Sequence, residues 1–287
     1  MSEEVEYISS PKEKISLYLV ATPIGNLSDI SERALETLEN ADFIAAEDTR
    51  KTGVLLSHYS IKKPLVSYYE HNLRQRGEEI IARLEAGETC VLVSDAGMPA
   101  VSDPGEQLVK QCYEHGLKVS AIPGPCAFVS AIAISGLSTK RFTFEGFLST
   151  AKNSRRERLE SVKTLEHTLI FYEAPHKLKG LLDDILQVLG DRRISLVREI
   201  SKIYEQVMLT TVSQAIKYYE ENEPKGEFVL VIEGAAEEKT EVDDETLEKE
   251  FYQLVEGGMA KTFAAKTLAR KYNLSKREIY ERFKEEN

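Results

Sequence analysis

The 287-residue sequence lacks a long hydrophobic run and a cysteine framework, and each absence excludes a class of protein. No stretch approaches the roughly 18–20 continuous apolar residues of a membrane-spanning helix, so we expect no membrane span. Residues 1–14 are polar and mixed in charge, without the basic-then-apolar order of a signal peptide. The three cysteines are an odd number without Cys-x-x-Cys spacing, which argues against a disulfide framework or a zinc site. These absences predict a protein of the reducing cytoplasm.

The common short motifs of nucleotide, metal and nucleophilic chemistry are also missing. Neither the Gly-x-Gly-x-x-Gly motif of dinucleotide-binding folds nor the phosphate-binding Gly-x-x-x-x-Gly-Lys-[Ser/Thr] loop is present. Without His-Glu-x-x-His, paired histidines or Cys-x-x-Cys, we predict no metal site. Gly-x-Ser-x-Gly is absent too, and Cys126 follows Pro125 on a predicted apolar helix. We therefore interpret Cys126 as a structural residue rather than a nucleophile.

The composition is that of an ordinary globular protein with an acidic balance. Hydrophobic residues make up 42% and charged residues 30%, which excludes disorder of the whole chain. The formal net charge is −11, so a protein that coats nucleic acid over its whole surface is not expected. A chain of this length accommodates two domains of roughly 100–150 residues each.

Strand and helix patterns alternate along the first half of the chain. Apolar runs typical of buried strands lie at 15–20, 43–46, 90–93 and 118–122. Helical periodicity lies between them at 30–41, 78–85 and 106–115, and Asp29 with Glu32 resembles a capping box for the first of these helices. This alternation predicts a mostly parallel sheet with helices on its faces, in which ligands bind beyond the carboxyl ends of the strands.

A second α/β region follows Gly124, and a differently charged region follows Gly234. The second region has predicted strands at 142–147, 168–172, 194–197 and 228–232 and predicted helices at 127–134 and 178–189. We expect an N-terminal tail over 1–14, α/β domains over 15–123 and 124–236, and a last module over 237–287.

The last module separates its charges along the sequence. Residues 237–256 hold nine acidic and two basic residues, which is typical of a solvated linker and a first helix. Residues 261–284 hold eight basic and two acidic residues, and Ser275 with Glu278 forms a plausible capping box for a final helix. Two helices joined by a turn at 272–274 indicate a helix-turn-helix-like module.

Rigid loops of small residues follow the predicted strands at 22–26, 94–105 and 123–127. Their glycines and alanines admit close approach of a flat ligand, and their prolines stiffen the loops. Such loops suit an adenosine-type cofactor, although simple tight turns between strand and helix explain them equally well. Asp95 and Asp103 lie eight residues apart in the second loop. A pair of catalytic carboxylates is one reading, but we favour Asp103 as the cap of the following helix.

A series of short motifs in order across about 15–234 resembles the ribosomal RNA small-subunit methyltransferases, the ribosomal branch of the tetrapyrrole-methylase-like superfamily. The motifs are Ala21–Leu27, Ala46–Arg50, His71-Asn72, Ser94–Pro99, Asp103–Gly105, Pro123–Pro125, Glu145–Phe147, Phe171–His176, Lys202 with Glu205, and Lys225–Glu227. Small-molecule members of the superfamily carry a glycine-rich first loop, whereas Ala21–Asn26 fits the ribosomal branch. Met98 departs from the small polar residue that is more common in the family.

The resemblance implies an architecture, a cofactor and a substrate. It implies two α/β domains with S-adenosylmethionine in the cleft between them, and a homodimer. It implies methyl transfer to the ribose 2′-oxygen of a cytidine in 16S rRNA of the small ribosomal subunit. By the same resemblance, cofactor contacts are expected from Pro23, Ser94, Asp95, Ala96, Val101, Gly124, Cys126, Ala127 and Tyr172.

The ribose hydroxyl is a weak acid, so a nearby base or cation would help the transfer. The candidates for catalytic roles are Glu47, Asp48, His71, Glu173 and Lys202, with Arg50 as a bidentate phosphate ligand. Simpler explanations are a local ion pair between Asp48 and Arg50, a hydrogen bond from His71 to Asn72 or a loop carbonyl, and an ordinary surface role for Lys202.

Positive charge is concentrated in two places in this acidic chain. One is the group Lys152, Arg155, Arg156 and Arg158, and the other is the basic C-terminal module. We predict that both contact RNA phosphates, against the alternative of a solvated loop and a solvated helix face.

Three other functions are compatible with the sequence. A small-molecule methyltransferase of the same superfamily, such as a tetrapyrrole methylase, is disfavoured by the first loop and the basic module. A nucleic-acid-binding regulator built on the C-terminal helices would leave the strand-end loops unexplained. A catalytically silent assembly factor that binds only the cofactor is the third.

Overall fold

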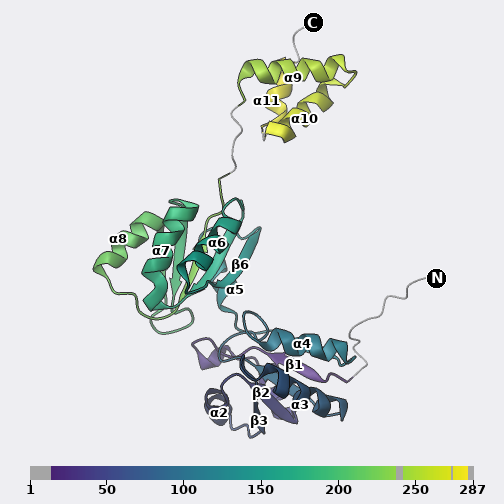
Figure 1. Ribbon diagram of the computed structural model, residues 1–287, viewed down its shortest axis with the longest axis vertical. Helices are drawn as coiled ribbons and strands as arrows, with labels where there is room; N and C mark the ends of the chain where they lie inside the picture. Colours follow the sequence, from purple (N-terminus) through teal and green to yellow (C-terminus); the bar gives the residue numbers. More distant parts are fainter. Residues whose placement is uncertain (1–13, 237–241, 273, 284–287) are drawn as a thin grey trace, which may run out of the picture. The chain divides into compact units, whose positions relative to one another are not determined.

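The computed structural model describes residues 14–236, 242–272 and 274–283. The contacts divide the chain into two compact units, and the boundary in the sequence lies between Ala235 and Ala236. We call them the α/β unit and the helical unit (Figure 1). Most of the predicted N-terminal tail, the start of the acidic linker at 237–241 and residue 273 of the predicted turn lie outside the described residues.

The first lobe of the α/β unit is a five-stranded parallel sheet in the order β3-β2-β4-β1-β5. Its strands are β1 (Leu17–Val20), β2 (Phe43–Ala46), β3 (Leu65–Ser67), β4 (Cys90–Val93) and β5 (Val119–Ile122). Its helices are η1 (Leu27–Asp29), α1 (Glu32–Asn40), α2 (Thr49–His58), α3 (Leu73–Glu85) and α4 (Gly105–Glu114). One cluster of buried side chains joins α1 and α2 to one face of the sheet, and another joins α3 and α4 to the opposite face. Because both faces are covered, the central strands are continuous apolar runs, and the predicted parallel sheet is confirmed.

The predicted capping box at the start of α1 is wrong. Ser31 is the N-cap, and its hydroxyl accepts a hydrogen bond from the Ala34 N–H at 3.1 Å. Asp29 instead ends the short 3-10 helix η1. The spacing of Asp29 and Glu32 resembles a capping box, but the helix starts two residues later than that pairing requires.

The second lobe is a mixed sheet in the order β6-β7-β10-β8-β9. Its strands are β6 (Phe142–Phe147), β7 (Thr168–Glu173), β8 (Arg193–Arg198), β9 (Gln206–Thr211) and β10 (Phe228–Ile232). Its helices are α5 (Ala127–Ile134), α6 (Lys152–Val162), α7 (Pro175–Leu189) and α8 (Val212–Glu221). Helices α6, α7 and α8 pack on one face, and α5 packs on the other. Strand β10 inserts between β7 and β8 and runs antiparallel to both, which the alternation of strands and helices does not reveal.

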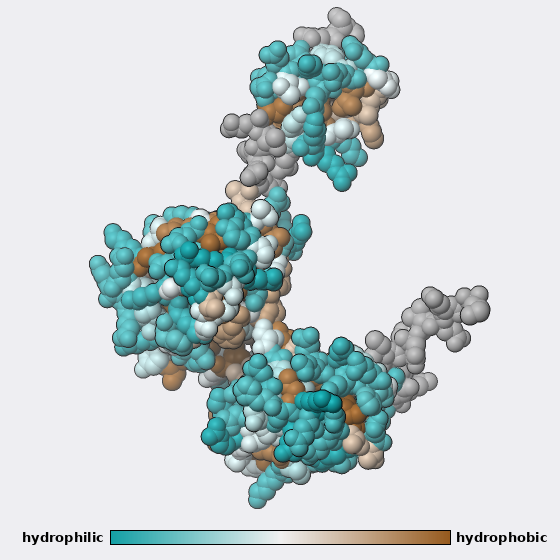
Figure 2. Space-filling model, viewed as in Figure 1, coloured by the Kyte–Doolittle hydropathy of each residue, from teal (hydrophilic) through white to brown (hydrophobic). Residues whose placement is uncertain are grey.

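The helical unit consists of α9 (Asp244–Glu256), α10 (Lys261–Tyr272) and α11 (Lys276–Phe283) around a small apolar core. The Ser275 hydroxyl accepts a hydrogen bond from the Glu278 N–H at 3.3 Å, as expected for the start of the last helix. The face of this unit drawn in Figure 2 is largely hydrophilic. No helix among the described residues has both the length and the apolar character needed to cross a membrane.

Two arginines of α6 are held by one buried carboxylate of α7. The Asp184 side chain is 1% exposed, and it accepts hydrogen bonds from Arg155 Nε at 2.8 Å and Arg156 Nε at 2.6 Å. Burial alone would raise the pKa of Asp184, but the bonds from Arg156 and Arg155 outweigh burial and lower it. This ion-paired group attaches α6 to α7.

The Asp184→Asn variant should lower the free energy of unfolding of the α/β unit by about 3 kcal/mol at pH 7, because two arginines lose their charged partner. Asp183→Asn is the control, since Asp183 is exposed on the same helix. The pKa of Asp184 is lowered in the fold, so its contribution is present above the unfolded pKa and disappears as pH falls through the folded value. Urea unfolding at pH 7 and at acidic pH measures both effects, and equal stability of the two variants at pH 7 would contradict the assignment.

Candidate functional site

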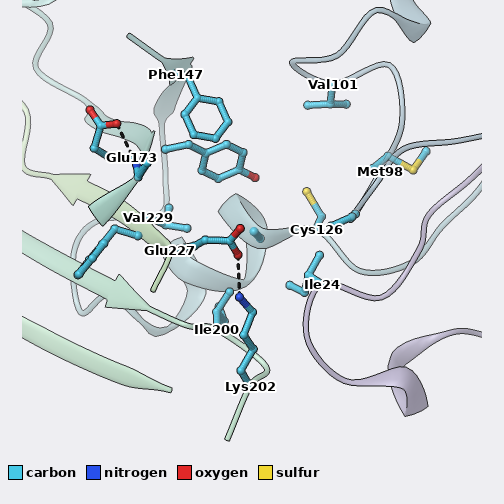
Figure 3. A pocket seen from close by; sticks show the side chains of 16 residues that line it. Ile24, Met98, Val101, Cys126, Phe147, Glu173, Ile200, Lys202, Glu227 and Val229 are labelled. Carbon is cyan, nitrogen blue, oxygen red and sulfur yellow. Dashed lines mark hydrogen bonds and ion pairs between the residues drawn. The ribbon is translucent and has the colours of Figure 1, made fainter. Parts of the chain in front are cut away.

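A cavity of about 300 Å³ lies beyond the carboxyl ends of strands from both sheets (Figure 3). The first lobe contributes the loops after β1 and β4. The second lobe contributes the ends of β6 and β7, the loop after β8, the start of α5 and the start of β10. The lining residues are Ile24, Ala96, Gly97, Met98, Val101, Cys126, Ala127, Phe147, Tyr172, Glu173, Ala174, Ile200, Lys202, Glu227, Phe228 and Val229. The wall is therefore mostly apolar, and its charged side chains are Glu173, Lys202 and Glu227.

Backbone pairing makes the first-lobe wall rigid. Thr22 and Gly97 exchange two backbone hydrogen bonds of 3.0 Å, and the Thr22 hydroxyl donates to the Ser94 carbonyl at 3.3 Å. Further along the same loop, Ala100 and Ser102 have positive φ angles of 63° and 62°, a conformation that costs L-residues energy. Such strain is typical of a loop whose shape is needed for binding.

Asp103 stabilises this strained loop. Its Oδ1 accepts hydrogen bonds from the Ala100 N–H at 2.8 Å and from the Gly105 N–H, the first residue of α4, at 2.7 Å. Burial raises the pKa of Asp103, although these two N–H groups oppose the shift. The side chain therefore bonds backbone groups at the helix entry, and it is absent from the cavity lining.

Aromatic side chains shape the second-lobe wall. The Tyr172 hydroxyl accepts a hydrogen bond from the Phe128 N–H at 3.0 Å, which satisfies one of the free donors at the start of α5. Its ring centroid lies 5.0 Å from that of Phe144 and 5.3 Å from that of Phe147. Burial raises the pKa of Tyr172 to about 12, and it also raises the pKa of the neighbouring Cys126 thiol. Both groups stay protonated at neutral pH, which agrees with a structural role for Cys126.

Lys202 carries the positive charge of the cavity. Its Nζ donates to Glu227 Oε2 at 2.7 Å (Figure 3) and to Glu199 Oε1 at 2.8 Å. Burial favours the neutral amine, but the two carboxylates outweigh burial and raise the pKa of Lys202. The ammonium group is therefore retained at neutral pH.

Glu173 belongs to the cavity lining, but its carboxylate is buried and points away from the cavity (Figure 3). The residue is 4% exposed, and its Oε1 accepts a hydrogen bond from the Ala174 N–H at 2.9 Å. Burial raises the pKa of Glu173, while that N–H and nearby cations oppose the shift.

The residues expected to contact a cofactor divide into two groups. Five of them line the cavity, namely Ala96, Val101, Cys126, Ala127 and Tyr172. The other four, Pro23, Ser94, Asp95 and Gly124, are absent from its lining but belong to the same loops. Ser94 is buried and its hydroxyl donates to the Gly97 carbonyl at 3.2 Å, while Asp95 pairs with Lys51 at 2.5 Å.

The residues expected to be catalytic divide in the same way. Glu173 and Lys202 line the cavity, whereas Glu47, Asp48, Arg50 and His71 do not. Asp48 caps α2 and pairs with Arg50 at 2.8 Å, and this bonding lowers the pKa of Asp48.

The remaining two of these side chains also lie at the protein surface. Glu47 is exposed, and its pKa is raised by partial burial and by the negative charges of Asp95 and Asp103. His71 is exposed, with its ring edge-on to Tyr69 at 6.1 Å.

Several lining residues carried no expected role. They are Ile24, Gly97, Met98, Phe147, Ala174, Ile200, Glu227, Phe228 and Val229. Most lie inside or beside the motifs singled out in the sequence, so the motif boundaries were a usable signal. Glu227 is the notable omission, because it follows Gly226 in a motif whose chemistry the sequence alone did not explain.

The four basic residues expected to grip RNA form part of helix α6. Arg155 and Arg156 bond the buried Asp184, and Arg158 bonds Glu145 at 2.6 Å. The Glu145 side chain is 1% exposed. Three of the four cations thus have carboxylate partners within the protein, because α6 packs against α7 and β6, and they are poor candidates for a phosphate-binding surface.

Comparisons with known proteins agree with this geometry. The family model described as Tetrapyrrole (Corrin/Porphyrin) Methylases matches residues 16–216. The Ribosomal RNA small subunit methyltransferase I of Synechocystis is 47% identical over 267 residues, which are 92% of this chain and 96% of that protein. The protein of the same name from Thermotoga maritima is 47% identical over 218 residues, which are 76% of this chain and 98% of that protein.

A solved structure shares the fold at low sequence identity. The uroporphyrin-III-C-methyltransferase of Thermus thermophilus superimposes with a TM-score of 0.54 at 20% identity, covering 76% of this chain and 94% of that protein. The two-lobed architecture, the cavity at the strand ends and the matched motifs have one common explanation: the chain belongs to the tetrapyrrole (corrin/porphyrin) methylase family.

Proposed function

We propose that the chain is a methyltransferase that transfers a methyl group from S-adenosylmethionine to 16S rRNA of the small ribosomal subunit. The observation that carries the proposal is the 47% identity to a ribosomal RNA small subunit methyltransferase over nearly the whole of both chains. The acceptor in this proposal is the ribose 2′-oxygen of a cytidine, as the family resemblance of the motifs implies. The protein works in the cytoplasm, where that RNA is found.

The cavity is suited to S-adenosylmethionine. Small residues such as Ala96, Gly97 and Ala127 admit close approach of a purine, and Met98 with Val101 provides apolar contact. The aromatic rings of Tyr172 and Phe147 suit a positively charged sulfonium. These lining residues therefore fit S-adenosylmethionine, which supplies an electrophilic methyl group when it is bound.

The protein's own residues must position the acceptor oxygen and stabilise the negative charge that develops on it. Lys202 is held between Glu199 and Glu227 and stays protonated, so it acts as a cation and not as a base. We assign it the stabilisation of negative charge that develops on the acceptor oxygen.

Glu173 has a structural role in this proposal and is not assigned as the base. Its carboxylate points away from the cavity (Figure 3) and accepts a hydrogen bond from the Ala174 N–H at 2.9 Å, so it fixes the chain where β7 ends.

The homodimer implied by the resemblance is part of the proposal as well. Large apolar side chains are exposed along the β8–β9 hairpin, with Ile203 94% and Tyr204 71% exposed. Contiguous exposed apolar residues of this kind favour burial against a second copy of the chain.

Radiolabelled methyl transfer from S-adenosylmethionine to small subunits that lack ribose methylation tests the function. The expected product is label in a single alkali-resistant dinucleotide at one cytidine. Failure to label either subunits or free ribosomal RNA, with cofactor binding intact in calorimetry, would contradict the proposal. It would favour a small-molecule methyltransferase or a silent assembly factor.

The Gly25→Ala variant should displace Lys202 and lower the rate by roughly 10- to 100-fold. A Cβ at Gly25 would overlap Lys202 Cγ and lie 3.2 Å from the Ile200 carbonyl oxygen, so the Lys202 side chain must move. Gly53→Ala is the control, because the nearest atom to its Cβ is Leu65 Cδ1 at 3.9 Å and alanine favours the interior of α2. Equal single-turnover rates for both variants would show that the placement of Lys202 is unimportant.

A further inference from the structure

One face of helix α10 presents an aromatic ring with two cations. Phe263, Lys266 and Arg270 lie at positions i, i+3 and i+7, so they share a face of the helix. All three are exposed, and Phe263 is 57% exposed although it is a large apolar residue. The opposite side of α10 carries Ala264 and Leu268 into the core of the helical unit. The exposed ring is thus outside that core, and we call these three residues the α10 face.

The acidic helix α9 neutralises other cations of the unit but not these two. Lys271 pairs with Glu250 at 2.7 Å, and Arg282 pairs with Asp244. Within the described residues of the helical unit, neither Lys266 nor Arg270 has a carboxylate partner. Positive charge in an acidic protein is therefore left uncompensated on the α10 face.

We propose that the α10 face binds a single-stranded segment of the substrate RNA, an inference that rests on the proposed function. An exposed aromatic ring such as Phe263 stacks on an unpaired base. Lys266 and Arg270 lie one and two turns further along the same face, where they bind adjacent phosphates. A protein partner would bury the ring without needing two unpaired cations beside it. The combination favours RNA, whose bases and phosphates match both features.

The helical unit lies outside the part of the chain that carries the chemistry. The family model ends at residue 216, before the helical unit begins, and 76% of this chain accounts for 98% of the Thermotoga relative. The cavity is lined entirely by residues of the α/β unit. The α10 face therefore contributes to the affinity for RNA and leaves the methyl-transfer step and cofactor binding unchanged.

The double variant Lys266→Glu with Arg270→Glu in the full chain tests the electrostatic part. Its affinity for small subunits and for protein-free small-subunit RNA should fall at least about tenfold. The slope of log K against log salt concentration should decrease in magnitude by about 1.4, because two phosphate contacts are lost. The control is Lys179→Glu with Lys217→Glu, which changes the net charge equally at exposed positions of α7 and α8. The control should bind as the wild type does.

The Phe263→Ala variant tests the stacking part. Its affinity for RNA should fall at least about fivefold while the salt slope stays unchanged, because stacking involves no counterion release. In both variants the rate at saturating RNA and the affinity for S-adenosylmethionine should equal those of the wild type.

Three results would overturn the inference. The first is RNA affinity of the double variant equal to that of its charge-matched control. The second is a loss of affinity for subunits but not for protein-free RNA, which would assign the face to a ribosomal protein. The third is a wild-type chain that neither binds nor methylates ribosomal RNA, which would overturn the proposed function too. The first two leave the proposed function intact, so the two failures can be told apart.

Discussion

Two backbone hydrogen bonds between Thr22 and Gly97 join the loops that follow β1 and β4, and the shape of the cavity depends on this joint. Both loops leave the carboxyl edge of a parallel sheet, where main-chain groups no longer have strand partners and must find others. Pairing the loops with each other satisfies those groups. It also fixes Ile24 and Met98 at the cavity wall, and Asp103 then supports the two left-handed residues, Ala100 and Ser102, that the loop needs.

Charge in this chain has different consequences according to whether it is paired. Asp184 is almost fully buried, and it is tolerated because Arg155 and Arg156 bond it. Lys202 in the cavity is held by Glu199 and Glu227, so its position and its protonation are both set before any ligand arrives. Lys266 and Arg270 have no such partner among the described residues of the helical unit, and their charge remains available to a ligand. Pairing thus separates cations that stabilise the fold from cations that can act on something else.

Much of the architecture could be predicted because burial leaves a direct record in the sequence. Strands covered on both faces, such as β2 and β4, are continuous apolar runs, and their bounds were predicted to the residue. Elements with little burial were missed. Strand β3 has three residues, none of them fully buried, and α6 is charged along most of its length. The insertion of β10 between β7 and β8 was also beyond prediction, because the partners of a strand depend on contacts far along the chain.

The sequence by itself determined that polar and small residues end the strands, and that the motifs belong to one family of methyltransferases. Both are local properties, since a residue type and its neighbours are enough to recognise them. Only the tertiary structure decided which of these residues face a common cavity. Glu47 and Glu173 both end a predicted strand, yet only Glu173 lines the cavity. The tertiary structure also showed that three of the α6 cations are bonded within the protein while the α10 face is open. The physical reason is that pairing and burial are set by residues distant in the sequence, and the chain must fold before they meet.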